Sequence, residues 1–415
     1  MLKQVLWVFL LAYLFTETIL LLLNSKNIRQ NLGANIFRDF IDDETFCKAT
    51  TYSLTRNTFS LLCLFYRVIL LAFILKLDVV TLYLNHFPFT QQIWLQSLLL
   101  FLWNFLLNSC SMPLEYFSTF KIEKDYGFNR TTHLLWVSDQ FKGFFVSACI
   151  NIPIFALLFY ILETCPKTWW IWSALGSFIL QVFLLWIYPK LILPLFNKLT
   201  PLKEGSLKER LDSLAQKSGF TCAAIQILDS SKRSTHSNAY CSSLGKIQQV
   251  VLYDTLLKNF TDEEIEAIVA HEIGHYKCKH IFKMLMTSFL CSFIGFKVCD
   301  YILQSDWLAN QLGVNYMSPL VLLVVLSTFL SLFSYWLNPL LNYFSRKYEY
   351  EADAFASKQS PYCGHQLVQA LRKLYRENLS NLFPHPWYSC FHYSHPTLLE
   401  RERAIYGKDH FSKDY

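Results

Sequence analysis

Two histidines four residues apart flank a glutamate near the middle of the chain. His271, Glu272 and His275 stand in the sequence His-Glu-Ile-Gly-His. Because positions i and i+4 of a helix lie on one face, both imidazoles can bind the same metal ion. Zinc accepts such nitrogen ligands and makes water acidic enough to supply hydroxide at neutral pH. Glu272 stands where it can take the proton of that water, so the pattern indicates a zinc metalloprotease site.

The residues before this motif predict where its helix begins. Thr261 is the expected N-cap, and Glu264, three residues later, completes a capping box. Phe260 and Ile265 occupy the two positions of a hydrophobic staple around that cap. The sequence therefore predicts a well-defined helix start ahead of the histidine pair, as the zinc interpretation requires.

A catalytic zinc ion needs a third protein ligand, with the fourth position left for water. His280 does not have the spacing of a third zinc histidine, and we interpret it as a surface residue or as a neighbour of a ligand. Two glutamates follow later, in the sequence Tyr-Glu-Tyr-Glu-Ala-Asp-Ala. Glu349 shares a helix face with Asp353, whereas Glu351 points elsewhere. Chemistry alone leaves Glu349 and Glu351 as alternatives, and the neighbouring alanines predict close packing.

The rest of the chain is apolar enough to need a bilayer. Hydrophobic residues make up 53% of the 415 residues and charged residues 16%, whereas soluble domains carry about 25% charge. A membrane-spanning helix needs about 20 mostly apolar residues. The sequence offers seven such segments: 4–24, 59–84, 93–112, 143–163, 169–190, 283–304 and 318–344.

The distribution of Lys and Arg predicts the orientation of these spans. Segments 25–58 and 113–142 are rich in both residues, whereas 77–92 and 305–317 contain neither. The positive-inside rule therefore places the N-terminus outside or in the lumen, and the C-terminus in the cytoplasm. The net charge of +6 is spread through these loops, so we do not expect a nucleic-acid partner.

Two long segments outside the spans fall on the cytoplasmic side and together suffice for one compact domain. Within the first of them, Leu207–Ser218 has a helical pattern, and Ala223–Leu228 and Val250–Tyr253 resemble strands. We expect a membrane domain of five spans at 1–190, the first part of a zinc protease domain at 191–282, spans six and seven at 283–344, and the second part of the protease domain at 345–415.

Several segments along the chain match the signatures of one protein family. They are Phe15–Thr18, Pro113–Thr131, Tyr188–Leu202, His236–Tyr240, Glu349 with Asp353, and Ser394–Pro396. In these segments the chain resembles the Ste24-type CAAX prenyl proteases, the seven-span branch of the M48 metallopeptidases. The resemblance implies a mostly α-helical multi-pass membrane protein, with seven transmembrane helices around a chamber and a zincin-like α+β catalytic domain.

The resemblance also implies roles for individual residues. Glu349 would be the third zinc ligand, and Asp353 would orient a zinc histidine through a hydrogen bond. Asn238 would contact the substrate backbone near the scissile bond. His395 would join Glu272 in catalysis by stabilising the tetrahedral intermediate, and a purely structural hydrogen bond is the alternative for this histidine.

The strand expected to pair with substrate contains Asn238, Ala239 and Tyr240. It continues as Cys241–Leu244, where the family usually has aromatic residues and glycine. Pairing through backbone hydrogen bonds does not depend on those side chains, so the departure concerns side-chain selectivity alone.

The expected function is that of a zinc metalloendopeptidase of the gluzincin type, with one Zn²⁺ per chain. It would remove the C-terminal tripeptide of prenylated CAAX substrates. A quality-control protease acting on unprenylated membrane proteins is the alternative, and a non-enzymatic scaffold or transporter is favoured least because the motif is intact. The expected partners are a peptide or protein substrate and the lipid bilayer, without an assigned oligomeric state. A bacterial inner membrane and the endoplasmic reticulum both fit, since the chain lacks a dilysine ending.

Overall fold

The computed structural model describes residues 1–33, 37–86, 92–220, 222–244, 247–305, 307–312, 318–360 and 362–407. Within these ranges, seven helices are long and apolar enough to cross a membrane, which confirms the number expected from the sequence. They are Leu2–Gln30, Asp43–Lys76, Ile93–Glu123, His133–Thr164, Trp169–Phe196, His280–Leu303 and Pro319–Ser357.

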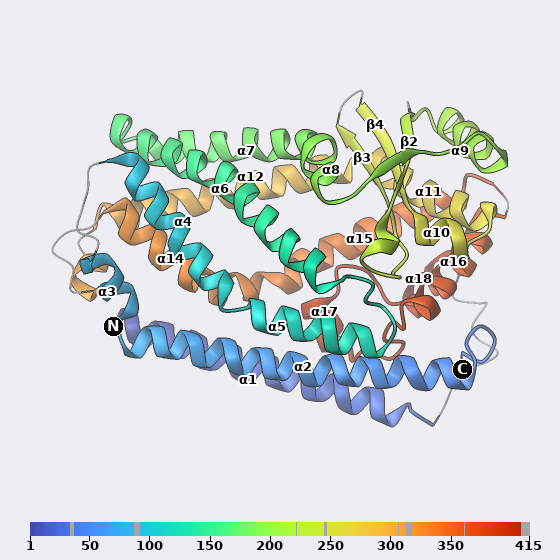
Figure 1. Ribbon diagram of the computed structural model, residues 1–415, viewed down its shortest axis with the longest axis horizontal. Coiled ribbons are helices and arrows are strands. Elements are labelled where there is room, and N and C mark those ends of the chain that lie inside the picture. The colour runs from blue at the N-terminus through green and yellow to red at the C-terminus, as the bar shows by residue number, and fades with distance from the viewer. Residues whose placement is uncertain are drawn as a thin grey trace.

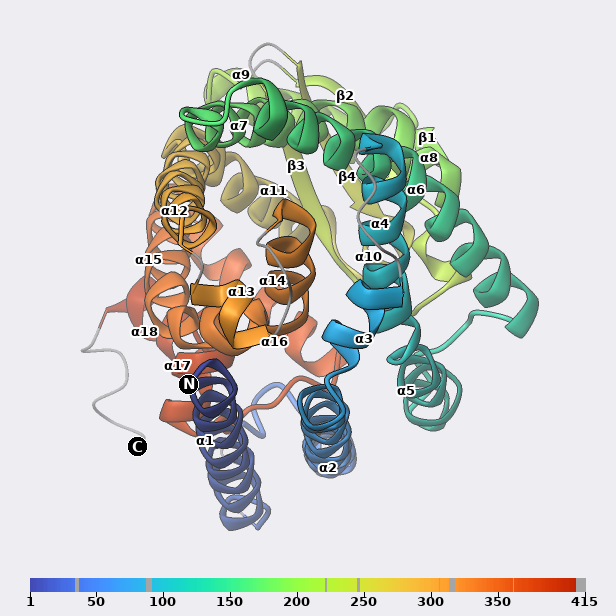
Figure 2. The same cartoon turned by 90° about the vertical axis from the view of Figure 1, so that its left-hand side faces the viewer.

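Several of these spans are built from more than one helical element. In chain order, the main elements are α1 (Leu2–Gln30), α2 (Asp43–Lys76), α4 (Ile93–Ser109), α6 (His133–Thr164), α7 (Trp169–Ile187), α12 (His280–Leu303), α14 (Pro319–Ser334) and α15 (Asn338–Ser357). The third span continues through α5 (Met112–Phe117) and η1 (Ser118–Glu123), and the fifth through η2 (Tyr188–Ile192) and α8 (Leu193–Phe196). A short turn, η4 (Tyr335–Leu337), joins α14 to α15. The helices run along the long axis of the molecule (Figure 1), and seen end-on most of them stand around its periphery (Figure 2).

The N-terminus lies at the end of the molecule opposite the β-sheet (Figure 1). The short helices α3 (Val79–His86) and α13 (Trp307–Leu312) lie at that end too. There the Leu2 N–H donates to Gln311 at 3.1 Å, and Lys3 pairs with Asp78 at 2.5 Å. The described parts of the two connections without Lys or Arg therefore lie at one end, as an alternating path of seven spans requires.

A four-stranded sheet with the strand order β1-β2-β4-β3 lies at the other end. The strand β1 (Leu199–Pro201) is antiparallel to β2 (Cys222–Leu228), and β2 is parallel to β4 (Ile247–Tyr253). The last strand, β3 (Ala239–Leu244), pairs with β4 in antiparallel register and ends the sheet. Both strands predicted from the sequence are confirmed, as is the predicted helix, which is α9 (Ser206–Lys217).

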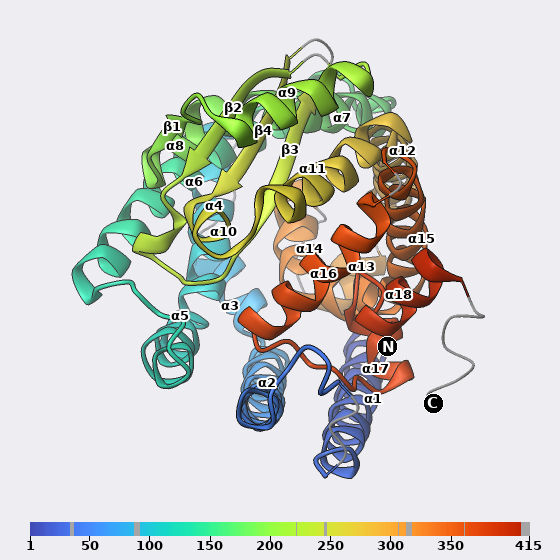
Figure 3. The ribbon, with the colours of Figure 1, turned by 90° about the vertical axis from the view of Figure 1, so that its right-hand side faces the viewer.

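Helices α9, α10 (Asp254–Asn259) and α11 (Asp262–Lys277) pack against this sheet (Figure 3), and a short turn η3 (Ser230–Lys232) precedes β3. After the last span, α16 (Cys363–Glu377) packs against α11 and α18 (Leu398–Tyr406) packs against α16, whereas α17 (Pro386–His392) lies against α15 and α1. Leu252, Ile273 and Leu367 belong to one buried core shared by the sheet, α11 and α16. Burial of this common apolar surface holds two segments together that are separated in sequence by two membrane spans.

Candidate active site

The helix that carries the histidine pair begins as the sequence predicts. The Thr261 side chain accepts from the Glu264 N–H, and the Glu264 carboxylate accepts from the Thr261 N–H, which completes the capping box. The two staple residues, Phe260 and Ile265, are buried in the same core. The capping box fixes the residue at which α11 begins and thereby the direction in which each of its side chains points. The residues next to the helix start therefore determine which face carries the histidines.

Close contact between α11 and α15 brings acidic side chains to that face. A Cβ atom at Gly274 would lie 3.0 Å from the Cα and carbonyl oxygen of Ala352, and 3.2 Å from the Phe355 ring. Ala352 and Ala356 are completely buried. The small residues predicted to allow close packing therefore do so. Gly274, which stands between the two histidines, lets α15 pack directly against α11.

Three ligand atoms converge where the helices meet. His271, His275 and Glu349 each offer one ligand atom, and these atoms lie within 4.8 Å of one another. The Glu349 carboxylate lies 3.2 Å from His275 Nε2 and 3.4 Å from His271 Nε2. Glu351 points away from both histidines and contacts His280 instead. Of the two alternatives left by the sequence, the structure brings Glu349 to the histidines.

The chemistry of this donor set fits a metal ion. His271 Nε2 and His275 Nε2 face each other at 3.1 Å, which requires a proton or a cation between them. Glu349 Oε2 is buried and has no hydrogen-bond partner among the described residues. Burial works against a charge on His271, but its hydrogen bond to Asp353 and the nearby Glu349 carboxylate outweigh this and raise its pKa to about 9. The site thus attracts positive charge, as a set of zinc ligands should.

The outer nitrogen of His271 is bound to a buried ion pair. Its Nδ1 lies 2.8 Å from Asp353 Oδ1, as the resemblance implies for an orienting carboxylate. Arg401, 7% exposed, donates to both oxygens of Asp353 at 2.8 and 2.5 Å. Sequence reasoning missed Arg401. It follows the capping box of Thr397 and Glu400, and nothing local marks it as buried.

The outer nitrogen of His275 has a different partner. His275 Nδ1 lies 2.9 Å from His280 Nδ1. His280 is 1% exposed, so its interpretation as a surface residue is wrong, and its contact with His275 agrees with its interpretation as the neighbour of a candidate ligand. The signal that could have identified it is its place, five residues after His275 at the start of the next helix.

The other predicted site residues lie around the same cavity. Glu272, Asn238 and His395 line a cavity of about 180 Å³ together with the three candidate ligands. Glu272 Oε2 accepts from the Cys241 N–H at 3.4 Å, so the carboxylate lies between the histidine helix and strand β3. The structure therefore brings Glu272, Asn238 and His395 together with the three candidate ligands, whereas Tyr240 of the predicted substrate strand lines a different cavity.

Asn238 and His395 are the exposed members of this group. His395 Nε2 lies 3.5 Å from Glu349 Oε1, and its Nδ1 lies 2.9 Å from Ser394 Oγ, while 65% of the side chain is exposed. Asn238 accepts from the Ala239 N–H at 2.8 Å. Both side chains are thus available to a bound substrate without rearrangement of the buried ligands.

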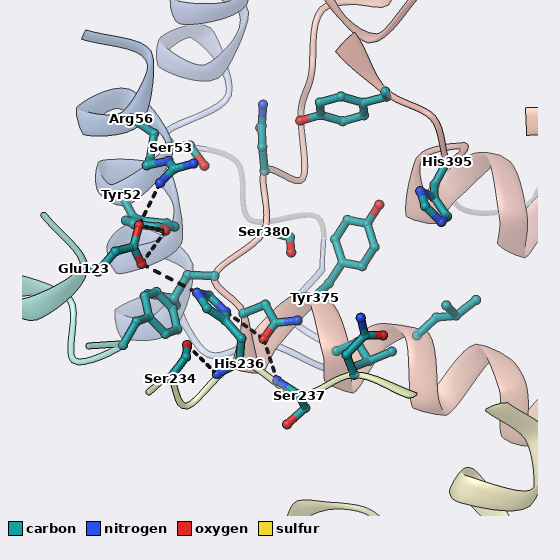
Figure 4. Close-up of a pocket in the computed structure, with 18 of the residues that line it drawn as sticks. Tyr52, Ser53, Arg56, Glu123, Ser234, His236, Ser237, Tyr375, Ser380 and His395 are labelled. Atoms are coloured by element: carbon teal, nitrogen blue, oxygen red, sulfur yellow. Dashed lines mark hydrogen bonds and ion pairs between the residues drawn. The ribbon is translucent and has the colours of Figure 1, made fainter. Parts of the chain in front are cut away.

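A larger polar cavity of about 1050 Å³ opens beside them. Figure 4 shows His395 on one side and the group Tyr52, Arg56, Glu123 and His236 across from it. Arg56 and Tyr52 both bind the Glu123 carboxylate, at 2.7 and 2.9 Å, so its charge is compensated. Six carboxamides contribute to the lining: Asn24, Asn57, Asn129, Asn238, Asn378 and Asn381.

An apolar cavity of about 690 Å³ lies farther along strand β3. Tyr240 and Cys241 of the strand form part of its lining. The rest comes mainly from the C-terminal end of α7 with η2 and from the N-terminal end of α12, and includes Leu184, Leu185, Tyr188, Ile281, Met284 and Leu285. The order along β3 is therefore the polar cavity, the cavity of about 180 Å³ that contains Glu272, and the apolar cavity. The middle one is the candidate active site, and we call it the catalytic cavity.

Comparison with known proteins agrees with this arrangement. Residues 24–198 match the family described as CAAX prenyl protease N-terminal, five membrane helices, and residues 201–408 match peptidase family M48. The chain belongs to peptidase family M48. Within it, CAAX prenyl protease 1 of Saccharomyces cerevisiae is 34% identical over 400 residues, which cover 89% of this chain and 87% of the relative. A homologue of that protease from Arabidopsis thaliana is 38% identical over 72% of this chain and 70% of its own length.

A solved structure has the same fold. The crystal structure of S. mikatae Ste24p aligns with a TM-score of 0.89 at 32% sequence identity, covering 97% of this chain and 98% of the other. The multi-pass helical architecture, the Ste24-type membership and the membrane metallopeptidase class expected from the sequence are thereby confirmed.

Proposed function

We propose that this protein is a zinc endopeptidase that holds one Zn²⁺ through His271, His275 and Glu349. The observation that carries the proposal is the convergence of these three side chains beside Glu272, with a buried carboxylate oxygen left without a hydrogen bond among the described residues. When bound, zinc would supply a Lewis acid that acidifies water and polarises the scissile carbonyl group.

The protein's own groups would manage protons and developing charge. Glu272 lines the catalytic cavity and would accept a proton from the attacking water. His395 and Asn238, on the exposed side, would hydrogen-bond the substrate, with His395 stabilising negative charge on the carbonyl oxygen. Asp353 would hold His271 in the tautomer that leaves Nε2 free for the metal.

The substrate would bind as an added strand beside Asn238, Ala239 and Tyr240. Because β3 ends the sheet, an antiparallel peptide can extend along it, with its N-terminal part toward Cys241 and its C-terminal part toward Asn238. A prenylated cysteine on the N-terminal side of the cut would then lie near the apolar cavity. The released tripeptide would enter the polar cavity, whose carboxamides suit peptide groups of any sequence.

The test of this substrate class compares one CAAX peptide with and without a farnesyl group, at matched concentration in detergent. Each buried methylene contributes about 0.8 kcal/mol, so we expect faster cleavage of the farnesylated peptide and slower but measurable cleavage of the other. Equal rates would remove the prenyl assignment and favour the quality-control alternative, for which the polar cavity alone would suffice.

We further propose that the protease domain, formed by 191–282 and 345–415, lies in the cytoplasm, and that the N-terminus lies outside or in the lumen. The positive-inside rule supports this orientation in either a bacterial inner membrane or the endoplasmic reticulum. In a background without native cysteines, an impermeant thiol reagent confined to the non-cytoplasmic side of a sealed membrane should label probes placed within 305–317. Labelling of probes within 203–218 under the same conditions would contradict the orientation.

A further inference from the structure

The turn between α11 and α12 places a buried histidine directly behind His275. Lys279 joins the two helices with a φ of 57°, in the left-handed region that costs a non-glycine residue roughly 1–2 kcal/mol. This turn returns the chain so that His280, the first residue of α12, packs beneath His275. A left-handed residue is common directly after a helix C-cap, so Lys279 both ends α11 and begins α12.

The hydrogen bonds of His280 have a defined direction. Its Nε2 lies 3.0 Å from Glu351 Oε2, and Lys283 Nζ donates to the same oxygen at 3.0 Å. A carboxylate only accepts, so His280 Nε2 donates and, in the neutral ring, Nδ1 accepts. The His275 Nδ1–H is then the donor across the 2.9 Å contact between the two rings. This leaves the lone pair of His275 on Nε2, the atom that faces His271 and Glu349.

Packing holds this histidine in one orientation. The Tyr348 ring stacks on His280 with centroids 4.6 Å apart and an angle of 19° between the planes. The Lys283 ammonium group lies over the Tyr348 ring, 5.2 Å from its centroid. Tyr348 and Glu351 flank Glu349 on α15, so one helix supplies both a candidate ligand and the support of another ligand.

We infer that His280 and Glu351 are positioning residues that fix the tautomer and ring angle of His275 for the metal. The inference rests on the proposed zinc site and extends it to residues that do not touch the metal. Cys278, His280 and Glu351 also lie close enough to hold an ion of their own. That assignment is disfavoured, because Lys283 already binds Glu351 and His275 already occupies His280 Nδ1.

The test measures the zinc dissociation constant by competition with a chelator, in full-length detergent-solubilised protein. We expect H280A to weaken zinc binding roughly 10- to 100-fold, the usual effect of losing such a partner. H280N should recover most of this affinity, because its side-chain oxygen can accept from His275 near the position of Nδ1. E351Q should lie between the wild type and H280A, and E209Q, an exposed carboxylate on α9, should bind as the wild type does.

A spectroscopic measurement separates positioning from general stability. With Co²⁺ in place of zinc, the visible d–d bands of H280A should shift, and those of H280N should return toward the wild type, at similar melting temperatures. Zinc affinity and bands unchanged in H280A would overturn the inference, as would equal losses in H280A and H280N that follow a fall in melting temperature. Two zinc ions in the wild type, one of them lost in C278S, would assign these residues to a separate site and overturn it as well. Failure of the wild type to bind zinc would instead contradict the proposed function.

Discussion

The catalytic cavity has two walls of opposite character. On the α11 and α15 wall, His271 and Glu349 are buried, and ion pairs such as Asp353 with Arg401 hold the side chains from behind. On the β3 wall, Asn238 is exposed and two cavities of about 1050 and 690 Å³ open on either side. Fixed geometry is thus concentrated where a metal would bind, and open volume where a substrate would lie.

This difference separates two kinds of mutational effect. Changes on the buried wall should alter metal binding or the chemical step for every peptide, because those groups act on any substrate. Changes around the open cavities should alter the preference among peptides and leave the metal in place. Each prediction below places one residue on one side of that division.

The largest effect should follow loss of a ligand. We expect H275A to purify without zinc, because two remaining ligands do not form a competitive site. E351A should retain one zinc per chain when zinc is supplied in excess, since Glu351 faces His280 and not the metal position. Elemental analysis of both proteins is the measurement. Zinc retained in H275A and lost in E351A would reverse our choice of ligands.

Removal of the proton acceptor should abolish turnover without loss of metal. E272Q keeps the size of the side chain but cannot accept a proton, so we expect at least a 100-fold lower rate, in the range found for lost general bases. Its zinc content should equal that of the wild type. Peptide cleavage followed by mass spectrometry provides the rate, and substantial activity in E272Q would exclude Glu272 from this role.

Weakening the support of His271 should have a smaller effect, on metal affinity first. D353N removes the charge that binds both His271 and Arg401, and we expect zinc binding to weaken about 10- to 100-fold. Arg401 would also remain buried without its full counter-charge, so the protein should be less stable. Chelator competition on D353N, with D212N at an exposed position of α9 as the control, tests this. Equal affinities in the two variants would show that Asp353 does not support the site.

The smallest predicted effect is one of preference. L285W would fill part of the apolar cavity. If the larger side chain keeps about two methylene groups of the farnesyl chain from being buried, cleavage of a farnesylated peptide should fall roughly tenfold. Cleavage of the unmodified peptide should not change. L290W adds the same side chain at an exposed position of the same helix and is the matched control. A similar loss for both peptides in L285W would show that this cavity does not bind the lipid.

The features of the site also differ in how far the sequence predicted them. The capping box of Thr261, the histidine spacing and the two strand-like runs are local patterns, and each appears in the structure where expected. Arg401 and the link from His280 to Glu351 depend on helices that meet only after folding, so no local pattern contains them. Glu349 was separable from Glu351 by resemblance, and the contact of Gly274 with Ala352 supplies the physical reason.

The most direct test of the central claim is release of the C-terminal tripeptide from a farnesylated CAAX peptide by one preparation, before and after metal exchange. We expect no release after chelation, and full recovery when one zinc ion per chain is restored. E272Q, loaded in the same way, should bind that zinc and release nothing. Tripeptide release that persists in fully chelated protein, or fails to return with bound zinc, would contradict the assignment of this cavity as a zinc protease site.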